Sequence, residues 1–370
     1  MIYLDNAATS FPKPKRVIRE VTRCLTQYCG NPGRSSHKLA MAAADKIFET
    51  RELIANFLNY EKCENVVFTP NATYALNLVI KGLVQEKCHC IVSDLEHNSA
   101  LRPLYKSLGK YGGELSVFDS SKPVGEAISA LIRPDTKIII STLCSNVNGC
   151  FINLPELSEV ARRHNLSLII DASQYLGHAP ISLDGIHFTA LCSAGHKGLF
   201  GIQGSAFAVI NCEELFDTLT EGGSGVDSFS PSMPMLLPER YESGTLPTPA
   251  IVGLNEGIRF INEVGIGEIE GRILHLTNIL KNELDGIKKL SVYGVKNGIA
   301  AFNLANIPSS VLSEQLDKSG IATRSGFHCA PLIHKKLGTD KIGAVRASLS
   351  YFNTENDIYR LVKSIKHISV

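Results

Sequence analysis

Short apolar runs alternate with amphipathic segments between about residues 38 and 215 of the chain. The segments with helical periodicity are 39–58, 73–83, 125–132 and 154–164. The strand-like runs between them are 65–68, 89–92, 114–118, 137–142, 167–170, 188–192 and 206–210. Several of these runs are nearly all apolar, as is typical of parallel strands covered on both faces. The alternation predicts an α/β fold with a mainly parallel seven-stranded sheet flanked by helices.

The pattern changes after about residue 220. A glycine-rich loop at 221–225 is followed by a proline-punctuated stretch and then by a long helix predicted over about 249–264. The remaining expected elements are a helix, a strand at 299–304, a helix at 309–319, strands at 321–324 and 345–351, and a last helix from about 354. At 370 residues the chain is also long for one core. We therefore expect a large α/β domain of residues 13–258 and a smaller α+β domain of residues 1–12 and 259–370.

Composition excludes several classes of function. The net charge of +1 gives no electrostatic reason to expect nucleic acid or an anionic membrane as partner. No apolar stretch approaches the roughly 20 residues that span a bilayer, and the first residues turn polar too early for a signal peptide. The ten cysteines include no CxxC pair, so reduced thiols in a cytoplasmic protein are expected. Cys88, His89 and Cys90 lack a second ligand pair, so no metal is expected.

One lysine lies in a chemically suggestive setting. Lys197 is flanked by small residues and follows the strand predicted at 188–192, and Asp171 closes the strand predicted at 167–170. Pyridoxal phosphate (PLP) requires both groups: an amine that forms a Schiff base, and a carboxylate that keeps the pyridine nitrogen protonated. The pair therefore indicates a PLP site.

Two further segments could complete such a site. Residues 68–73 link a strand to a helix, so backbone amides and the Thr73 hydroxyl would favour an anion such as phosphate at the helix N-terminus. The alternative is that Thr73 or Asn71 only caps the helix. His97 follows the strand predicted at 89–92, where its ring could stack on an aromatic cofactor. The alternative for His97 is an ordinary surface histidine.

The order of these segments strengthens the interpretation. The Thr73 segment, His97 and the segments 145–149, 171–174 and 193–197 all follow predicted strands. Because the carboxyl ends of parallel strands meet at one edge of a sheet, all five should lie around one site.

Taken together, these motifs resemble the class V branch of fold-type I PLP enzymes, and within it the cysteine desulfurase and selenocysteine lyase family. The similarity runs from residues 3–8 to 346–349. Segment 324–329 looks like the catalytic-cysteine segment of the Suf-type (group II) desulfurases. The resemblance implies that L-cysteine is converted to L-alanine, with the sulfur transferred to Cys329 as a persulfide. Selenocysteine lyase, or a class V aminotransferase or lyase that does not use the cysteine, remains an alternative.

The resemblance also implies a role for each site residue. Lys197 would bind PLP covalently, and Asp171 would pair with the pyridinium nitrogen. Gln174 would contact the phenolic oxygen of the cofactor, and His97 would stack on its ring. The phosphate would be held by Ala72, Thr73 and His196, together with Thr245 from a neighbouring subunit. The residues near the substrate would be Arg346, Asn146, Arg324 and His37. Arg346 would hold the substrate carboxylate, because two guanidinium N–H groups match two oxygens.

The resemblance implies a homodimer with shared sites, with segment 31–37 near the interface, and a sulfur-acceptor protein as a further partner. Cys329 would act as a thiolate, since a thiol is a poor nucleophile, and Arg324 and His328 are expected to lower its pKa. A buried, inert cysteine is the alternative.

The chain departs from the family pattern at Ala194, where a serine is usual. The phosphate therefore loses a hydroxyl worth about 1 kcal/mol, unless Ser193 or a backbone group replaces it.

Overall fold

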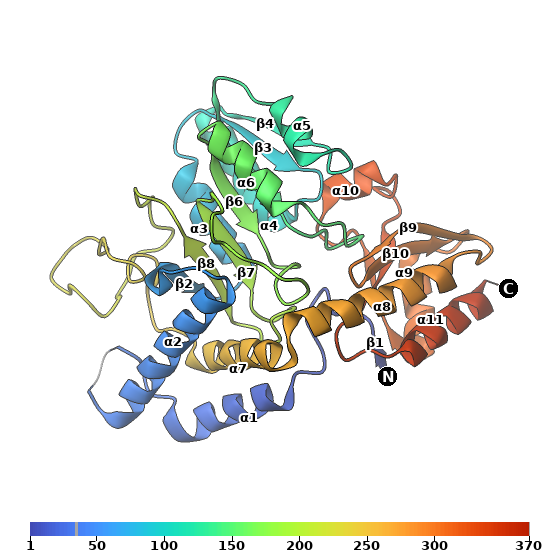
Figure 1. The fold of residues 1–370 in the computed structure, drawn as a ribbon, viewed down its shortest axis with the longest axis horizontal. Coiled ribbons are helices and arrows are strands. Elements are labelled where there is room, and N and C mark those ends of the chain that lie inside the picture. Colours follow the sequence, from blue (N-terminus) through green and yellow to red (C-terminus); the bar gives the residue numbers. More distant parts are fainter. Residues whose placement is uncertain (34–35, 370) are drawn as a thin grey trace.

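The computed structural model describes residues 1–33 and 36–369. Arg34 and Ser35, which belong to the segment expected near a shared interface, lie outside the described residues. A seven-stranded sheet forms the centre of the larger half (Figure 1). Its strands, in order across the sheet, are β2 (Val66–Thr69), β8 (Ala206–Ile210), β7 (Ala190–Ala194), β6 (Ser167–Asp171), β5 (Thr136–Thr142), β3 (His89–Ser93) and β4 (Glu114–Phe118). Only β8 runs antiparallel to its neighbours, so the other six strands end at one edge.

Helices cover both faces of this sheet. One face is covered by α2 (Lys38–Phe57), α5 (Val124–Ser129), α6 (Leu154–Arg163) and α7 (Thr248–Val264). The other face is covered by α3 (Ala72–Leu83) and α4 (Asn98–Tyr111). Along β6, Leu168 and Ile170 pack into the first core and Ile169 into the second, as the alternation of side chains along a strand requires. Burial on both faces explains why these strands are nearly all apolar.

A second, antiparallel sheet lies beside the first (Figure 1). Its order is β12 (Arg324–Gly326), β13 (Ala344–Ser348), β10 (Ile299–Leu304) and β9 (Leu290–Lys296). The helices of this part are α8 (Ile266–Leu284), α9 (Ser309–Lys318), α10 (Pro331–Lys336) and α11 (Glu355–Ile368). The N-terminus joins this layer, because β1 (Ile2–Tyr3) pairs in parallel with β11 (Ile321–Ala322). Near the first sheet lie α1 (Lys15–Arg23), followed by a π-helix at Cys24–Tyr28, and a 3-10 turn at Cys63–Asn65.

Most predicted elements are confirmed within two or three residues, and the differences have local causes. The helix predicted at 125–132 is the shorter α5. The strand predicted at 321–324 is two strands, because the chain changes its pairing partner from β1 to β13 at Thr323. The strand predicted to reach residue 351 ends at Ser348. A turn follows it, in which the Ser350 amide donates a hydrogen bond to the Asn353 side chain. Helix α4 was not predicted, and it contains Pro103 in its interior, a residue that ordinarily marks a break.

None of the helices in the described part of the chain is long and apolar enough to cross a membrane.

Candidate active site

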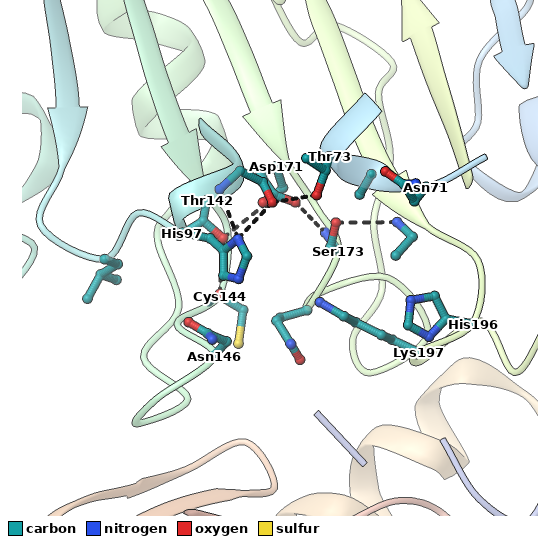
Figure 2. Close-up of a pocket in the computed structure, with 15 residues that line it drawn as sticks. Asn71, Thr73, His97, Thr142, Cys144, Asn146, Asp171, Ser173, His196 and Lys197 are labelled. Atoms are coloured by element: carbon teal, nitrogen blue, oxygen red, sulfur yellow. Dashed lines mark hydrogen bonds between the residues drawn. The ribbon is translucent and has the colours of Figure 1, made fainter. Parts of the chain in front are cut away.

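A pocket opens at the carboxyl edge of the large sheet, where β2, β3, β5, β6 and β7 end (Figure 2). The prediction that the five segments meet at one edge is therefore confirmed. The expected residues that line this pocket are Ala72, Thr73, His97, Asn146, Asp171, Gln174, His196 and Lys197.

Lys197 reaches the pocket from the loop after β7. The neighbouring Gly198 fixes the position of this loop, since a Cβ there would lie 2.2 Å from the carbonyl oxygen of Leu176. Burial lowers the pKa of Lys197, and the positive charges of Arg346 and Arg324 act in the same direction, whereas Asp171 opposes them. The net effect is a lowered pKa, which favours the neutral amine. The neutral amine is the form that reacts with an aldehyde.

Asp171 is the last residue of β6 and is buried. Its Oδ1 accepts a hydrogen bond from the Ser173 amide at 2.9 Å. A buried carboxylate facing an open pocket is suited to pair with a cationic ring nitrogen.

The start of α3 shows which of Asn71 and Thr73 caps the helix. Asn71 caps α3, with its Oδ1 accepting from the Tyr74 amide at 2.9 Å. Thr73 is not the cap, and its hydroxyl lies 2.7 Å from the Ser99 hydroxyl. His196 stands beside this helix start, and its Nδ1 is buried without a partner among the described residues. Burial, then the charges of Lys197 and Lys13, lower the pKa of His196 to about 4, so the ring is neutral.

The hydroxyl missing at Ala194 is not supplied by Ser193. The Ser193 Oγ is fully buried, has no partner in the described part of the chain, and does not line the pocket. Ser173 does line it, and its Oγ accepts a hydrogen bond from the Ala194 amide at 3.3 Å. A hydroxyl therefore still lies next to Ala194, but on the loop after β6.

His97 is the N-cap of α4 rather than an ordinary surface histidine. Its Nδ1 accepts from the Ser99 amide at 3.0 Å and lies 2.9 Å from the Ser99 hydroxyl. Burial, followed by the charge of Lys197, lowers the pKa of His97 to about 4. The ring therefore reaches the pocket in its neutral form.

The N-terminal segment lies against the pocket residues. Gln174 donates a hydrogen bond from Nε2 to the Ala7 carbonyl oxygen at 2.7 Å, which leaves the second amide hydrogen for a ligand. The Lys13 ammonium and the Ser10 amide both donate to the His196 carbonyl oxygen, at 2.8 and 3.2 Å.

Cys329 lies in the loop between β12 and α10. Its side chain is exposed, which excludes the buried, inert cysteine. His328 and Cys329 both adopt positive φ, 50° and 56°. This conformation costs roughly 1–3 kcal/mol per residue and persists where the surroundings hold it. Asn146 donates from Nδ2 to the His328 carbonyl at 2.7 Å, and the Asn98 amide donates to the Cys329 carbonyl at 2.7 Å. These bonds hold the cysteine loop against the pocket.

His328 does not supply the positive charge that was expected beside Cys329. The His328 ring is buried, and burial together with the charge of Arg346 lowers its pKa to about 3. It is therefore neutral at physiological pH and supplies no charge. Its nitrogens lie 3.4 Å from His334 Nε2 and 3.4 Å from the Arg324 carbonyl oxygen.

Besides Cys329, four expected residues lie outside the pocket lining of this chain. Arg346 is fully buried next to it, donating to the Asn146 carbonyl at 2.9 Å and to Asp5 at 2.7 Å, and its Nε has no partner among the described residues. Arg324 is exposed on β12, near enough to affect the pKa of His97. His37 is exposed and caps α2, and Thr245 is exposed.

Several pocket residues were not singled out from the sequence. They are Leu95, Ser99, Thr142, Cys144 and Ser173. Thr142 ends β5 and Ser173 follows β6, so the strand-end rule that selected Asp171 would also have selected them. Ser99 could be found only by recognising that α4 begins at Asn98.

The donor set fits PLP. Lys197 and Asp171 meet the cofactor's two main requirements, and the unpartnered Nδ1 of His196 beside the N-terminus of α3 suits its phosphate. The described His, Cys, Asp and Glu side chains form no group that could hold a metal ion.

Comparisons with known proteins agree with this geometry. The family described as aminotransferase class V matches residues 2–361. A probable cysteine desulfurase of Methanothermobacter thermautotrophicus is 30% identical over 381 residues, covering 100% of this chain and 94% of the relative. A probable cysteine desulfurase of Borreliella burgdorferi is 30% identical over 388 residues, covering 100% and 92%. The apo structure of a cysteine desulfurase from Thermococcus onnurineus NA1 superposes with a TM-score of 0.91 at 28% identity, covering 100% of this chain and 94% of that one.

Proposed function

The chain belongs to the class V aminotransferase family, whose members depend on PLP, and we propose that it is a cysteine desulfurase. In the overall reaction, L-cysteine and the Cys329 thiol give L-alanine and a Cys329 persulfide, so sulfur passes from substrate to enzyme with no external oxidant. The observation that carries the proposal is the exposed Cys329, held by Asn98 and Asn146 against a pocket that contains Lys197 and Asp171.

The cofactor, when bound, supplies an electron sink for the substrate Cα. Lys197 would hold it covalently, and Asp171 would keep its ring nitrogen charged. The remaining cofactor ligands would be Gln174, His97, Ala72, Thr73 and His196, with Thr245 from a second subunit. Ser173 would contribute the hydroxyl that Ala194 lacks.

The substrate carboxylate would bind Arg346, whose buried Nε has no partner in the described chain. Asp5 holds the other side of that guanidinium at 2.7 Å and so fixes its direction. Asn146 and Arg324 would lie near the substrate, and His37 would approach from the partner subunit.

Substitution of Cys329 tests the function. Wild type, Cys329→Ser and Cys29→Ser are supplied with cysteine, and alanine and sulfide are measured under reducing conditions. Cys29 is the other exposed cysteine and serves as the matched control. Cys329→Ser should lose at least tenfold in alanine formation, whereas Cys29→Ser should match wild type. Equal rates in all three proteins would exclude Cys329 as the sulfur acceptor.

Selenocysteine in the same assay separates desulfurase from selenocysteine lyase. Selenol is the better leaving group, so a lyase would retain selenocysteine turnover in Cys329→Ser. Titration of the protein with PLP, followed by absorbance, tests the residue that holds the cofactor. Lys197→Ala should abolish the absorbance band of covalently held PLP that wild type shows.

A homodimer is proposed from exposed apolar side chains in and near α1 and α2 and in the loop before α7. They are Phe11, Ile18, Leu25, Leu39, Met41, Phe48, Phe229, Met235 and Leu236. His37 and Thr245 lie in the same two regions. Sedimentation should give a dimer for wild type and a monomer for Phe48→Asp, with Tyr359→Asp on α11 as the exposed-aromatic control.

We divide the chain into a large domain, 13–258, and a small one, 1–12 and 259–370, since one apolar cluster joins Ile2 and Leu4 only to residues beyond 275. Limited proteolysis should cut at Gly265, between α7 and α8, which is the break in helix nearest to this boundary. An acceptor protein would take sulfur from the exposed Cys329, measurable as persulfide transfer between purified proteins.

A cytoplasmic location is supported by ten free cysteines and is tested by cell fractionation.

A further inference from the structure

We propose that Ser99 sets the tautomer of His97: its amide and hydroxyl both point at Nδ1, so the single proton of the neutral ring is held on Nε2. Ser99 is thereby a positioning residue for the proposed function. The tautomer itself follows from the geometry whether or not the chain is a desulfurase.

The backbone bond fixes the direction. The Ser99 N–H lies 3.0 Å from His97 Nδ1, and a backbone N–H can only donate. Nδ1 must therefore carry a lone pair rather than a proton. A neutral imidazole has one proton on its two nitrogens, so Nε2 holds it.

The hydroxyls extend this arrangement to the phosphate end of the pocket. The Ser99 Oγ lies 2.9 Å from Nδ1 and 2.7 Å from the Thr73 Oγ1. Because Nδ1 can only accept, the Ser99 hydroxyl donates to it, and the Thr73 hydroxyl donates to Ser99. If an anion accepts the Thr73 proton instead, the Ser99 hydroxyl can still donate to Nδ1. The tautomer is therefore the same with and without an anion at Thr73.

Burial and the nearby positive charges keep the His97 ring neutral. Burial lowers its pKa to about 4, with Lys197, Arg324 and Arg102 acting in the same direction and Asp171 opposing them. Figure 2 shows one ring nitrogen of His97 engaged in hydrogen bonds and the other on the opposite side of the ring, toward the open pocket. The group that His97 presents to a bound molecule is consequently an N–H donor. His97 would act first as a hydrogen-bond donor or acid, and as a base only after it has given up this proton.

The test is the ¹⁵N NMR spectrum of histidine-labelled full-length protein, with and without PLP, compared among wild type, Ser99→Ala and Ser99→Thr. His97→Gln assigns the resonances. Wild type should show an unprotonated Nδ1 and a protonated Nε2. Ser99→Ala removes one of two donors to Nδ1, which should shift the tautomer ratio about fivefold toward Nδ1–H and raise the pKa of His97. Ser99→Thr keeps the hydroxyl and should restore the wild-type spectrum.

A protonated Nδ1 in wild type would overturn the proposal, as would a Ser99→Ala spectrum with unchanged His97 shifts and pKa. Circular dichroism on each variant separates a local change from loss of folding. In the PLP-loaded protein, the pH profile of cysteine turnover should shift in Ser99→Ala and not in Ser99→Thr. Failure of the desulfurase assay leaves the NMR result unaffected, so the two hypotheses fail separately.

Discussion

The backbone amide of Asn98 donates a 2.7 Å hydrogen bond to the carbonyl oxygen of Cys329. Asn98 is the first residue of α4, where amides have no partner within the helix. The loop that carries Cys329 is thus fastened to the same helix start whose N-cap is His97. One short segment of the large sheet's edge positions both side chains.

Helix α10, which follows the cysteine loop, is held by its last residue, Lys336. The Lys336 ammonium forms ion pairs with Asp94 and Asp119 at the ends of β3 and β4. Lys336→Met should loosen the loop and lower kcat for cysteine severalfold, because a partly exposed ion pair contributes about 1 kcal/mol or less. The wild-type rate should fall with added salt more steeply than the variant's. Lys335→Met, on the same helix, is the control and should resemble wild type.

The sequence predicts the centre of this site well, for a simple physical reason. The carboxyl ends of parallel strands lie at one edge of the sheet. Asp171 and Lys197 are therefore expected at that edge without any knowledge of the loop conformations. The buried strands are equally visible, because their runs are apolar throughout.

Other parts depend on tertiary contacts that no local pattern contains. Helix α4 has Pro103 in its interior, and a proline ordinarily indicates a helix break. The helix was therefore not predicted, and neither was the position of Ser99 in its first turn. His328 stands beside Cys329 in the sequence, yet its ring is buried next to His334 and carries no charge. The placement of Arg346 against Asp5 joins residues from opposite ends of the chain.

Beneath Cys329, a buried chain of polar groups should fix the loop conformation. His334 Nδ1 lies 2.7 Å from the Thr339 hydroxyl, and His334 Nε2 lies 3.4 Å from His328 Nδ1. Thr339→Val keeps the shape but leaves His334 without its partner, at a cost of about 1–3 kcal/mol. We expect a changed rate of Cys329 alkylation by iodoacetamide and slower desulfuration. Thr339→Ser keeps the hydroxyl and should behave as wild type; identical alkylation in all three would contradict this role.

A buried ion pair should dominate the stability of the region around α2. Arg51 donates two hydrogen bonds of 2.7 Å to Glu242, whose Oε1 also accepts the Phe68 amide. Arg51→Met leaves a buried carboxylate unpaired and should cost about 3–5 kcal/mol in the free energy of unfolding. Arg51→Met combined with Glu242→Gln should recover much of that loss in urea unfolding. A double variant no more stable than Arg51→Met would show that the charge is not the cause.

Glu96 should give the protein an unusual dependence of stability on pH. It is fully buried, and its Oε1 accepts from the Ser93 hydroxyl and the Thr142 amide at 2.5 and 2.6 Å, whereas Oε2 has no partner among the described residues. Burial raises the pKa of Glu96 to about 8 from 4.5, and nearby Asp171 and Asp94 act in the same direction. Between these pH values the folded protein keeps the proton and the unfolded chain loses it. Stability therefore falls as the pH rises through this window, and the effect is complete above pH 8.

Glu96→Gln isolates this effect, since the amide keeps the accepting Oε1 but cannot ionise. The variant should gain on wild type by on the order of 1.4 kcal/mol per pH unit across the window, measured by urea unfolding of PLP-free protein from pH 5 to 8. The histidines with lowered pKa values, His97 and His196 among them, stabilise the fold as pH rises toward 6.5, but they are present in both proteins and cancel in the difference. Glu86→Gln, at an exposed position, should run parallel to wild type. If Glu96→Gln also ran parallel, the Glu96 carboxyl would be ionised in the folded protein.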